Sequence, residues 1–376
     1  MRTVIPVENN DTLAAVRGFL KRLLEAEIVD ALLVPMETPT GAITPALVAD
    51  TDLLDAANPL APVMGLNAAR VAGRVSVREP RARIGVVLRP CELRALVELV
   101  KLKQASLDDL VTIGVDCLGT YDVPVYATMQ GDGQVDMAAL LATAQSGDLA
   151  PQEGATAAQQ YAFRDACQMC EKPNVEEADI VLELFGADLT TGIPVSLPDE
   201  MAEKLEMSPT EGDGKRSAVI EKVVAARTSV RDERFAEIRQ RIEQEGIEGV
   251  LATCVRCHNC MTVCPICYCK TCLFKSPVFD HEPAQYMNWA RRKGAYRLPA
   301  DTMLFHLTRL NHMVLSCIGC GMCTSCCPAE LPVGQVFRAI GQQVQEVFDY
   351  EPGRSVEEPL PLITFREDEW EEVGEE

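Results

Sequence analysis

Two stretches near the C-terminal end of the chain carry almost the same arrangement of cysteines. Residues 254–265 read CVRCHNCMTVCP, and residues 317–328 read CIGCGMCTSCCP. Both fit the pattern C-x2-C-x2-C-x3-C-P, in which three thiols lie within seven residues and a fourth precedes a proline. A tight loop that presents three thiolates on one side suits a metal centre that needs several soft ligands. The sequence therefore predicts two such loops in one domain.

This spacing is the bacterial ferredoxin run, in which three thiolates of one run and the fourth cysteine of the other hold each [4Fe–4S] cluster. We expect two clusters with crossed ligands, site A (Cys254, Cys257, Cys260, Cys327) and site B (Cys317, Cys320, Cys323, Cys264). Structural zinc is a poorer explanation, because its two C-x2-C pairs usually stand a dozen or more residues apart. Disulfides are also a poor explanation, because the chain starts MRTVIPVENN, without an apolar signal segment.

Length, charge and hydropathy limit the class of protein. At 376 residues the chain should hold two or three domains. No apolar run approaches the roughly 18–20 residues of a membrane span. Sixteen cysteines without a secretory signal indicate a reducing compartment, and we expect the cytoplasm. A net charge of −21 argues against a nucleic acid partner, whose phosphates would be repelled.

Charge is unevenly distributed along the chain. The segment 265–316, between the two cysteine runs, has only three acidic residues against seven basic ones: Lys270, Lys275, Arg291, Arg292, Lys293, Arg297 and Arg309. These cations either offset the negative charge of the clusters or form a face for a partner or a phosphate. Residues 366–376 carry seven acids, which form either a solvated tail or a docking tail for a basic partner.

The first 120 residues alternate between helical and strand patterns. Residues 12–28 have apolar residues at helical spacing. Short apolar runs at Ala31–Met36, Ile84–Leu88 and Leu110–Val115 predict strands, and Glu92–Lys103 predicts a helix between the last two. This alternation is typical of an α/β layered domain with an at least partly parallel sheet.

We therefore predict an α/β (α+β) N-terminal domain with a mixed sheet and a C-terminal ferredoxin-like helical domain with two [4Fe–4S] motifs. The expected boundaries are 1–245 for the first domain, 246–350 for the second with an inserted segment at 265–316, and 351–376 for an acidic extended tail. Further expected elements are a strand at Val181–Phe185 and helices at Asp232–Glu243, around Thr302–Leu315 and at Pro332–Phe348.

Four more cysteines lie in the α/β part, and we call them site C (Cys91, Cys117, Cys167, Cys170). Cys91 and Cys117 directly follow predicted strands, and ligands gather at the carboxyl ends of strands in open α/β sheets. Cys167-x2-Cys170 can add two ligands from a loop. These spacings leave two explanations open, a third cluster or buried, inert thiols.

The order of these motifs resembles the beta-subunit family of deazaflavin-dependent hydrogenases and formate dehydrogenases (FrhB/FdhB). The resemblance rests on Pro90-Cys91-Glu92, Asp116-Cys117-Leu118-Gly119, and Cys167-x2-Cys170 followed by Ala178-Asp179-Ile180. The C-terminal stretches CPICYC, FHLTRLNHM and CIGCGMC are similar to the formate dehydrogenase branch. In that family cysteines in these contexts hold one [4Fe–4S] cluster, so the resemblance implies a third cluster at site C.

The resemblance also implies a function. In such a complex, electrons from a formate dehydrogenase or hydrogenase catalytic subunit pass along clusters to FAD. They leave as a hydride to the deazaflavin coenzyme or continue to a heterodisulfide-reductase-type partner. Two other functions stay open: a stand-alone iron–sulfur flavoenzyme that reduces a small organic substrate, and a non-catalytic adapter that joins two enzymes.

FAD is the cofactor for which the sequence departs from the family. Members usually open with a Ser-Gly-Gly-type segment, whereas this chain has Val7-Glu-Asn-Asn-Asp-Thr12 and lacks a GxGxxG fingerprint. We place FAD in the first domain, near residues 10–12 and 64–70. The candidate contacts are Asn10, Thr12, Gly65, Asn67 and Arg70, each of which is equally plausible as a cap or turn residue. No catalytic residue is assigned.

Several residues near the cysteine runs have no assigned role. Cys267, Cys269, Cys272 and Cys326 are either packing thiols or ligands of another cluster, for which no fourth ligand is evident. His258, His306 and His312 are expected to be structural or to donate hydrogen bonds.

Overall fold

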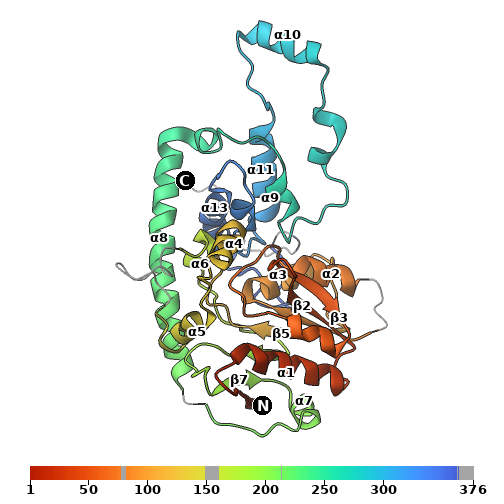
Figure 1. The fold of residues 1–376 in the computed structure, drawn as a ribbon. Helices are drawn as coiled ribbons and strands as arrows, with labels where there is room; N and C mark the ends of the chain where they lie inside the picture. The colour runs from red at the N-terminus through yellow and green to blue at the C-terminus, as the bar shows by residue number, and fades with distance from the viewer. Residues whose placement is uncertain (78–81, 149–160, 213, 362, 364–376) are drawn as a thin grey trace.

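The computed structural model describes residues 1–77, 82–148, 161–212, 214–361 and 363, so the acidic run 366–376 lies outside the described residues. Its N-terminal part is built on one seven-stranded sheet with the order β1-β7-β6-β5-β4-β2-β3 (Figure 1). The strands are β1 (Arg2–Pro6), β2 (Ala31–Glu37), β3 (Ile43–Val48), β4 (Ile84–Leu88), β5 (Leu110–Val115), β6 (Ile180–Leu182) and β7 (Gly192–Ser196). The central strands β2, β4, β5 and β6 are parallel, and β3, β7 and β1 pair antiparallel at the edges. The predicted mixed sheet is confirmed.

The central strands are apolar because helices and loops cover both faces of the sheet. Every residue of β4 is buried, as expected for a parallel strand that is covered on both sides. The helices of this part are α1 (Thr12–Glu25), α2 (Ala69–Ser76), α3 (Pro90–Lys101), α4 (Val123–Gly131), α5 (Met137–Ser146), α6 (Asp165–Gln168) and α7 (Asp199–Lys204), with a short 3-10 helix η1 (Thr51–Ala56).

Residues 89–92 contain the signals that start helix α3. Pro90 takes the first helical position, where the missing N–H is not needed. The Glu92 carboxylate accepts a hydrogen bond from the Arg89 N–H at 2.9 Å and another from the Ala68 N–H at 2.8 Å. These contacts fix the first turn of α3 directly after β4, and Cys91 with it.

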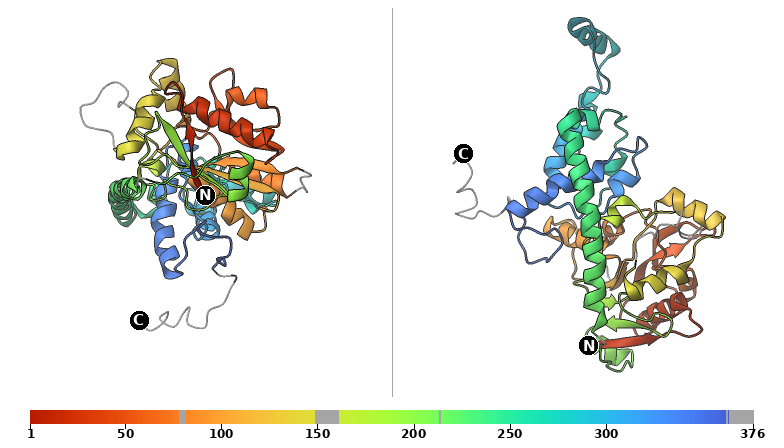
Figure 2. Two further views of the ribbon diagram at one scale, coloured as in Figure 1. Left: turned by 90° about the horizontal axis from the view of Figure 1, so that it is seen from below. Right: turned by 90° about the vertical axis from the view of Figure 1, so that its left-hand side faces the viewer.

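Helix α8 (Lys215–Val250) links the two parts of the molecule. It runs along one side, from the edge of the sheet to the cysteine-rich part (Figures 1 and 2). The helix is interrupted at Gly246, whose φ of 69° and ψ of 162° are outside the helical range. The predicted domain boundary near 245 falls at this break, and the division into domains stays a prediction.

The C-terminal part consists of short helices around several small apolar clusters. Its elements are α9 (Asn259–Thr262), η3 (Leu273–Lys275), η4 (Pro277–Phe279), α10 (Pro283–Lys293), α11 (Thr302–Met313), α12 (Met322–Ser325) and α13 (Val333–Val347). The predicted helices at 302–315 and 332–348 correspond to α11 and α13. Helix α10, by contrast, stands at the end of an arm that projects from the body (Figures 1 and 2).

The end of the described chain returns to the sheet and fastens the two parts together. The Tyr350 hydroxyl donates to Glu98 Oε1 at 2.6 Å, and the Gly353 N–H donates to the same atom at 2.8 Å. Arg94, also on α3, donates to the Pro352 carbonyl at 2.9 Å. Glu98 is fully buried and also contacts Lys101 Nζ at 3.4 Å. In the described part of the chain, no helix is both long and apolar enough to cross a bilayer.

Candidate metal centres

The four cysteines of site A line one cavity. Cys254 and Cys257 come from the loop before α9, Cys260 lies in α9, and Cys327 comes from the other cysteine run. Arg256 and His258 have left-handed backbone conformations, with φ of 53° and 62°. These two turns let the loop present its cysteines on one side. Cys257 is exposed, whereas none of the thiols of sites B and C is.

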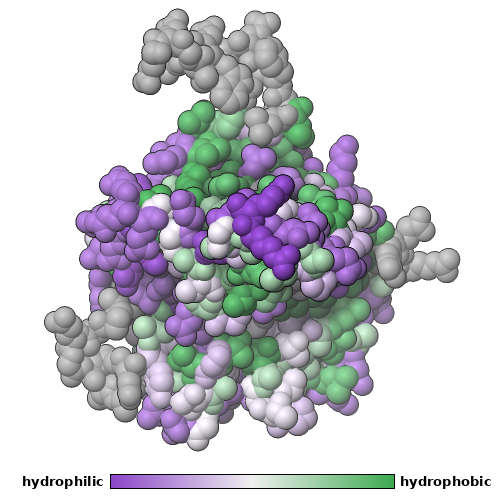
Figure 3. All heavy atoms as spheres, turned by 90° about the horizontal axis from the view of Figure 1, so that it is seen from above, coloured by the Kyte–Doolittle hydropathy of each residue, from purple (hydrophilic) through white to green (hydrophobic). Residues whose placement is uncertain are grey.

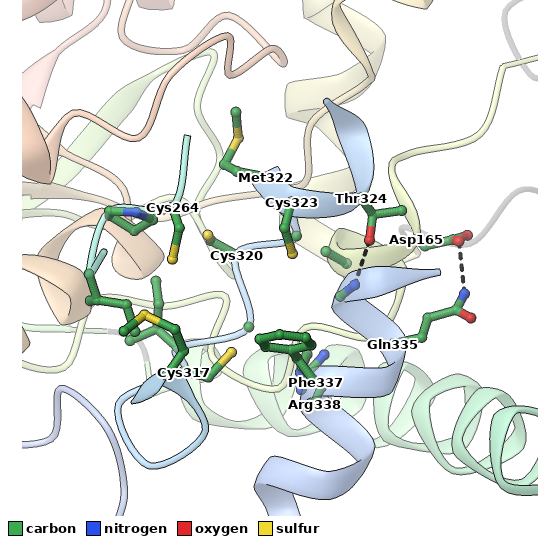
Figure 4. A pocket seen from close by; sticks show the side chains of 18 of the residues that line it. Asp165, Cys264, Cys317, Cys320, Met322, Cys323, Thr324, Gln335, Phe337 and Arg338 are labelled. Carbon is green, nitrogen blue, oxygen red and sulfur yellow. Dashed lines mark hydrogen bonds between the residues drawn. The ribbon is translucent and has the colours of Figure 1, made fainter. Parts of the chain in front are cut away.

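The cysteines of site B line a second cavity, in the manner expected from the sequence. Figure 4 shows the thiols of Cys264, Cys317, Cys320 and Cys323 around one space, with α13 residues Phe337 and Arg338 beside them. Gly321 has a φ of 70°, and a Cβ there would lie 2.2 Å from the Cβ of Ala166. Glycine is therefore required where this loop crosses α6.

The fourth cysteine of each run thus lies in the cavity of the other run, which agrees with the crossed pairing. Among the described residues, no group of three or more His, Cys, Asp or Glu side chains is arranged to hold a single metal ion. A four-iron cluster is larger than an ion, so its thiolate ligands stand further apart. Four thiols line each of the two cavities, which suits such a group, and ligation itself stays a prediction.

Site C forms at the carboxyl edge of the sheet. Burial, then Glu92 and the Cys117 thiol, raise the pKa of Cys91 well above its usual range, and Cys170 contributes further. Burial raises the pKa of Cys117 to about 11, with contributions from Cys167 and Cys170. Because electrostatic effects between thiols fall off with distance, the four thiols of site C lie near one another, and their ligation of a cluster stays a prediction. Cys91 also interacts with Cys320, so site C adjoins site B.

Asp116 positions two of the loops that carry site C. Its buried carboxylate accepts hydrogen bonds from the Val175 and Leu184 N–H groups, each at 2.9 Å, and pairs with Arg216 of α8. The residue that follows, Cys117, donates its N–H to the Pro173 carbonyl at 2.8 Å. The Cys117 loop and the loop after Cys170 are thereby held together.

Two buried arginines lie between the three sites. Arg309 Nη1 is 3.2 Å from Cys260 Sγ of site A, and its charge also acts on Cys264 and Cys323 of site B. Arg164 Nη2 is 3.7 Å from Cys167 Sγ of site C, and its charge acts on Cys320 of site B. The order of the sites in space is therefore A, B, C, with a buried cation at each step.

One of the three histidines contacts a site A thiol. His306 Nε2 lies 3.3 Å from Cys254 Sγ. Burial, then Arg309 and His258, lower the pKa of His306 to about 4, so its ring is neutral and suited to donate one hydrogen bond to a thiolate. His258 stacks on Phe305, with ring centroids 4.7 Å apart. His312 is exposed on α11.

The four remaining cysteines do not line the cavities of sites A and B. Cys272 Sγ lies 3.6 Å from the Met261 sulfur, and Cys326 donates to the Cys323 carbonyl at 3.5 Å. Cys267 packs against two apolar clusters, and Cys269 is exposed. These contacts favour packing roles for three of them.

The five predicted flavin contacts do not form one pocket. Asn10 is exposed, and the Thr12 hydroxyl donates to the Leu189 carbonyl at 2.9 Å. Arg70 donates to the Thr262 carbonyl, and a Cβ at Gly65 would meet its nearest neighbour only at 3.7 Å. Only the buried Asn67 Nδ2 lacks a partner among the described residues. The flavin site stays a prediction.

Sequence reasoning included Arg309 among the cations that could offset the clusters, but it missed Arg164 and a cavity of about 350 Å³ beside sites B and C. Cys170 and Cys317 lie on the wall of this cavity, with α3 residue Arg94 and α13 residue Arg338. The missed basic residues come from segments far apart in the sequence. No local pattern marks them, whereas the cysteine spacing marks their neighbours.

No family model matches the chain, but curated proteins with similar sequences exist. It is 24% identical over 306 residues to the beta subunit of the F420-dependent formate dehydrogenase of Methanocaldococcus jannaschii, covering 75% of this chain and 76% of that protein. It is 26% identical over 396 aligned residues to the beta subunit of F420-dependent formate dehydrogenase 1 of Methanococcus maripaludis, covering 95% and 94%. Over most of its length, the chain is thus similar to beta subunits of F420-dependent formate dehydrogenases. The recognition from the order of the cysteine motifs is confirmed.

Among solved structures, the chain resembles one from the F420-reducing [NiFe] hydrogenase complex of Methanosarcina barkeri. The likeness has a TM-score of 0.44 at 12% identity, and it covers 63% of this chain and 92% of the other.

Proposed function

We propose that the chain is the electron-relay subunit of a formate dehydrogenase- or hydrogenase-type complex, and that a separate subunit carries out the catalysis. The observation that carries this proposal is the row of twelve cysteines in three adjoining groups, A, B and C. The names of the two relatives support the kind of complex.

Bound [4Fe–4S] clusters would supply one-electron carriers at the three sites. The residues of the chain would hold each carrier and set its surroundings. Arg309 and Arg164 would offset negative charge between neighbouring sites, and His306 would donate a hydrogen bond at the Cys254 thiolate. Such contacts tune the potential of a cluster.

Sites A and C, at the two ends of the row of cysteine sites, differ in their surroundings. This difference suggests which partner would bind at each end. Site A has the exposed thiol of Cys257, and its neighbour Val255 is 62% exposed. Site C lies at the edge of the sheet, where ligands of α/β folds gather. A catalytic subunit at site A, and a deazaflavin coenzyme or a heterodisulfide-reductase-type partner beyond site C, would make use of both ends. Such chemistry suits the cytoplasm.

FAD in the N-terminal domain stays part of the proposal only as the family's expectation. Asn67 Nδ2 is the one observation in its favour, so we derive no step through a flavin. Without a flavin, the chain would be a cluster relay that acts as an adapter.

Anaerobic purification of the tagged chain from its native source tests the proposal. We expect about twelve irons per chain, as three cubane clusters require, and a large catalytic subunit in the same complex. In the full-length chain, replacing Cys254, Cys257, Cys317 and Cys320 by Ser should leave about four irons at site C. Iron absent from this folded variant would remove the third cluster. A wild-type chain without a catalytic subunit would favour the stand-alone flavoenzyme, provided that flavin is found.

A further inference from the structure

The arm between the cysteine runs, residues 276–300, has no cover from the rest of the described chain. No residue of α10 at its tip is buried. The ring contacts of residues 281–296 are made among themselves: His281 with Tyr286 and Trp289, Tyr286 with Trp289, and Trp289 with Tyr296, at 4.9–5.7 Å between centroids. This aromatic cluster gives the arm its shape without attaching it to the body.

A short helix in such a position needs an additional partner. Isolated helices shorter than about 12–15 residues are marginal in water, and α10 has 11 residues. The arm nevertheless exposes large apolar side chains, with Val278 58%, Met287 54% and Leu298 60% exposed. Exposed apolar side chains gathered on one segment mark a surface for another molecule.

The charge of the tip indicates the nature of that molecule. Arg291, Arg292 and Lys293 are exposed in the last turn of α10, and none of them forms an ion pair with another described residue. Figure 3 looks onto the end of the molecule from which α10 projects, and it shows strongly hydrophilic side chains beside hydrophobic ones. In a chain of net charge −21, this local excess of positive charge fits an acidic partner surface.

Offsetting the clusters does not explain these three cations. The basic side chain of the insertion that contacts a site thiol is Arg309, which is buried in the body. Arg297 donates to the Ala252 carbonyl at 2.7 Å. The tip cations, by contrast, are carried away from the body by the arm (Figure 1).

The base of the arm lies at the rim of site A. Phe279 stacks on Phe274 at 5.5 Å and lies under the Arg256 guanidinium at 5.9 Å. Arg256 also pairs with Asp301, where the chain re-enters the body. Because Arg256 directly precedes the exposed Cys257, both ends of the arm are fastened next to the most exposed thiol of the three sites. A protein that covers site A would meet the arm.

We propose that the arm is the docking element for the catalytic subunit that exchanges electrons at site A, and that this subunit presents an acidic surface with an apolar patch. The inference rests on the proposed function and specifies where its partner binds. The exposed apolar side chains of the arm would pack against the patch, while the tip cations would pair with the carboxylates around it.

The test compares two triple charge reversals in the native complex. The first is Arg291→Glu, Arg292→Glu and Lys293→Glu on the arm. The matched control is Arg74→Glu, Lys103→Glu and Arg239→Glu, three exposed cations that no described ion pair uses. We expect at least about tenfold less catalytic subunit to co-purify with the arm variant than with the wild type at 0.15 M salt. Exposed charges act over about 8 Å at this salt concentration. Iron content should be unchanged, and the control should match the wild type.

A photo-reactive residue at Met287 provides an independent measurement on an otherwise unchanged chain. We expect it to cross-link to an acidic segment of the catalytic subunit. Normal recovery of that subunit by the arm variant, a cross-link to a second copy of this chain, or no cross-link would overturn the inference. If the wild type also lacks a catalytic subunit, it is the proposed function that fails.

Discussion

At the scale of single residues, crossed pairing makes each run depend on the other. Cys327 lies in the cavity of Cys254, Cys257 and Cys260, although it is 67 positions from the last of them in sequence. We expect Cys327→Ser to disturb the cluster of site A and leave that of site B intact. Cys264→Ser should do the opposite. Electron paramagnetic resonance of the reduced proteins distinguishes the two, and the reverse pattern would rule out the crossed assignment.

Arg309 should set the potentials of sites A and B together, because it is the buried cation between them. Arg309→Met keeps an apolar side chain of similar length against Phe305 and Phe337 but removes the charge. We expect both potentials to become more negative by roughly 50 mV, about tenfold in a one-electron equilibrium. A redox titration followed by electron paramagnetic resonance measures the change.

Arg309→Lys is the control for that experiment, since it retains the charge. Its potentials should stay closer to those of the wild type. Equal potentials in Arg309→Met and the wild type, with full iron content, would show that the guanidinium serves only packing.

At the scale of elements, the sequence predicts a helix or strand best where a continuous apolar run can only form a buried strand. The bounds of β4 and β5 could be read directly because both are short apolar runs. Strands β1 and β7 were missed, since each finds its partner about 190 residues away. Helix α8 was predicted only in part because few of its residues are buried, which leaves little apolar periodicity to detect.

The candidate sites also differ in how well the sequence predicts them. Cysteine spacing predicted which thiols meet in the cavities of sites A and B, because chemistry restricts how thiolates surround a cluster. The flavin contacts were chosen from turn and cap residues, which occur in every loop. Thr12 illustrates the difficulty, since its hydroxyl proves to bind a backbone carbonyl.

The break in α8 gives an element-scale prediction. Gly246 has a φ of 69°, and a Cβ there would lie 3.0 Å from the Glu248 carboxylate. We expect Gly246→Ala to destabilise the protein by about 1–3 kcal/mol, the usual cost of a strained backbone. In α1, Gly18 is helical and has open space around it, so Gly18→Ala should stabilise by up to about 1 kcal/mol. Thermal denaturation under anaerobic conditions measures both, and equal effects would contradict the argument from conformation.

At the scale of the whole molecule, Tyr350 joins the end of the described chain to the sheet. Burial, then the nearby Glu98 carboxylate, raise the pKa of the Tyr350 hydroxyl. Its contribution to stability is therefore present below the ordinary tyrosine pKa of about 10 and is lost as the pH rises above it. Tyr350→Phe should cost about 1–3 kcal/mol at pH 8, because a buried acceptor loses a donor.

The pH dependence separates this contact from general packing. The stability difference between wild type and Tyr350→Phe should shrink as the pH is raised from 9 to 11, because the tyrosine then ionises in the unfolded wild type while the folded-state hydroxyl stays protonated. The melting temperature measured across this range provides the check. A constant difference would assign the effect to lost packing around the ring.

The pairing of β1 with β7 also has a consequence for how the chain is made. Residues 2–6 leave the ribosome first, but their partner strand at 192–196 follows only after most of the α/β part has been synthesised. At about 5–20 residues per second, the first strand waits roughly 10–40 seconds for its partner. Until β7 is made, the growing sheet has an open edge, first at β5 and then at β6, to which a strand of another nascent chain can pair. The sheet is therefore completed late, and a chain interrupted before residue 192 would expose that edge permanently.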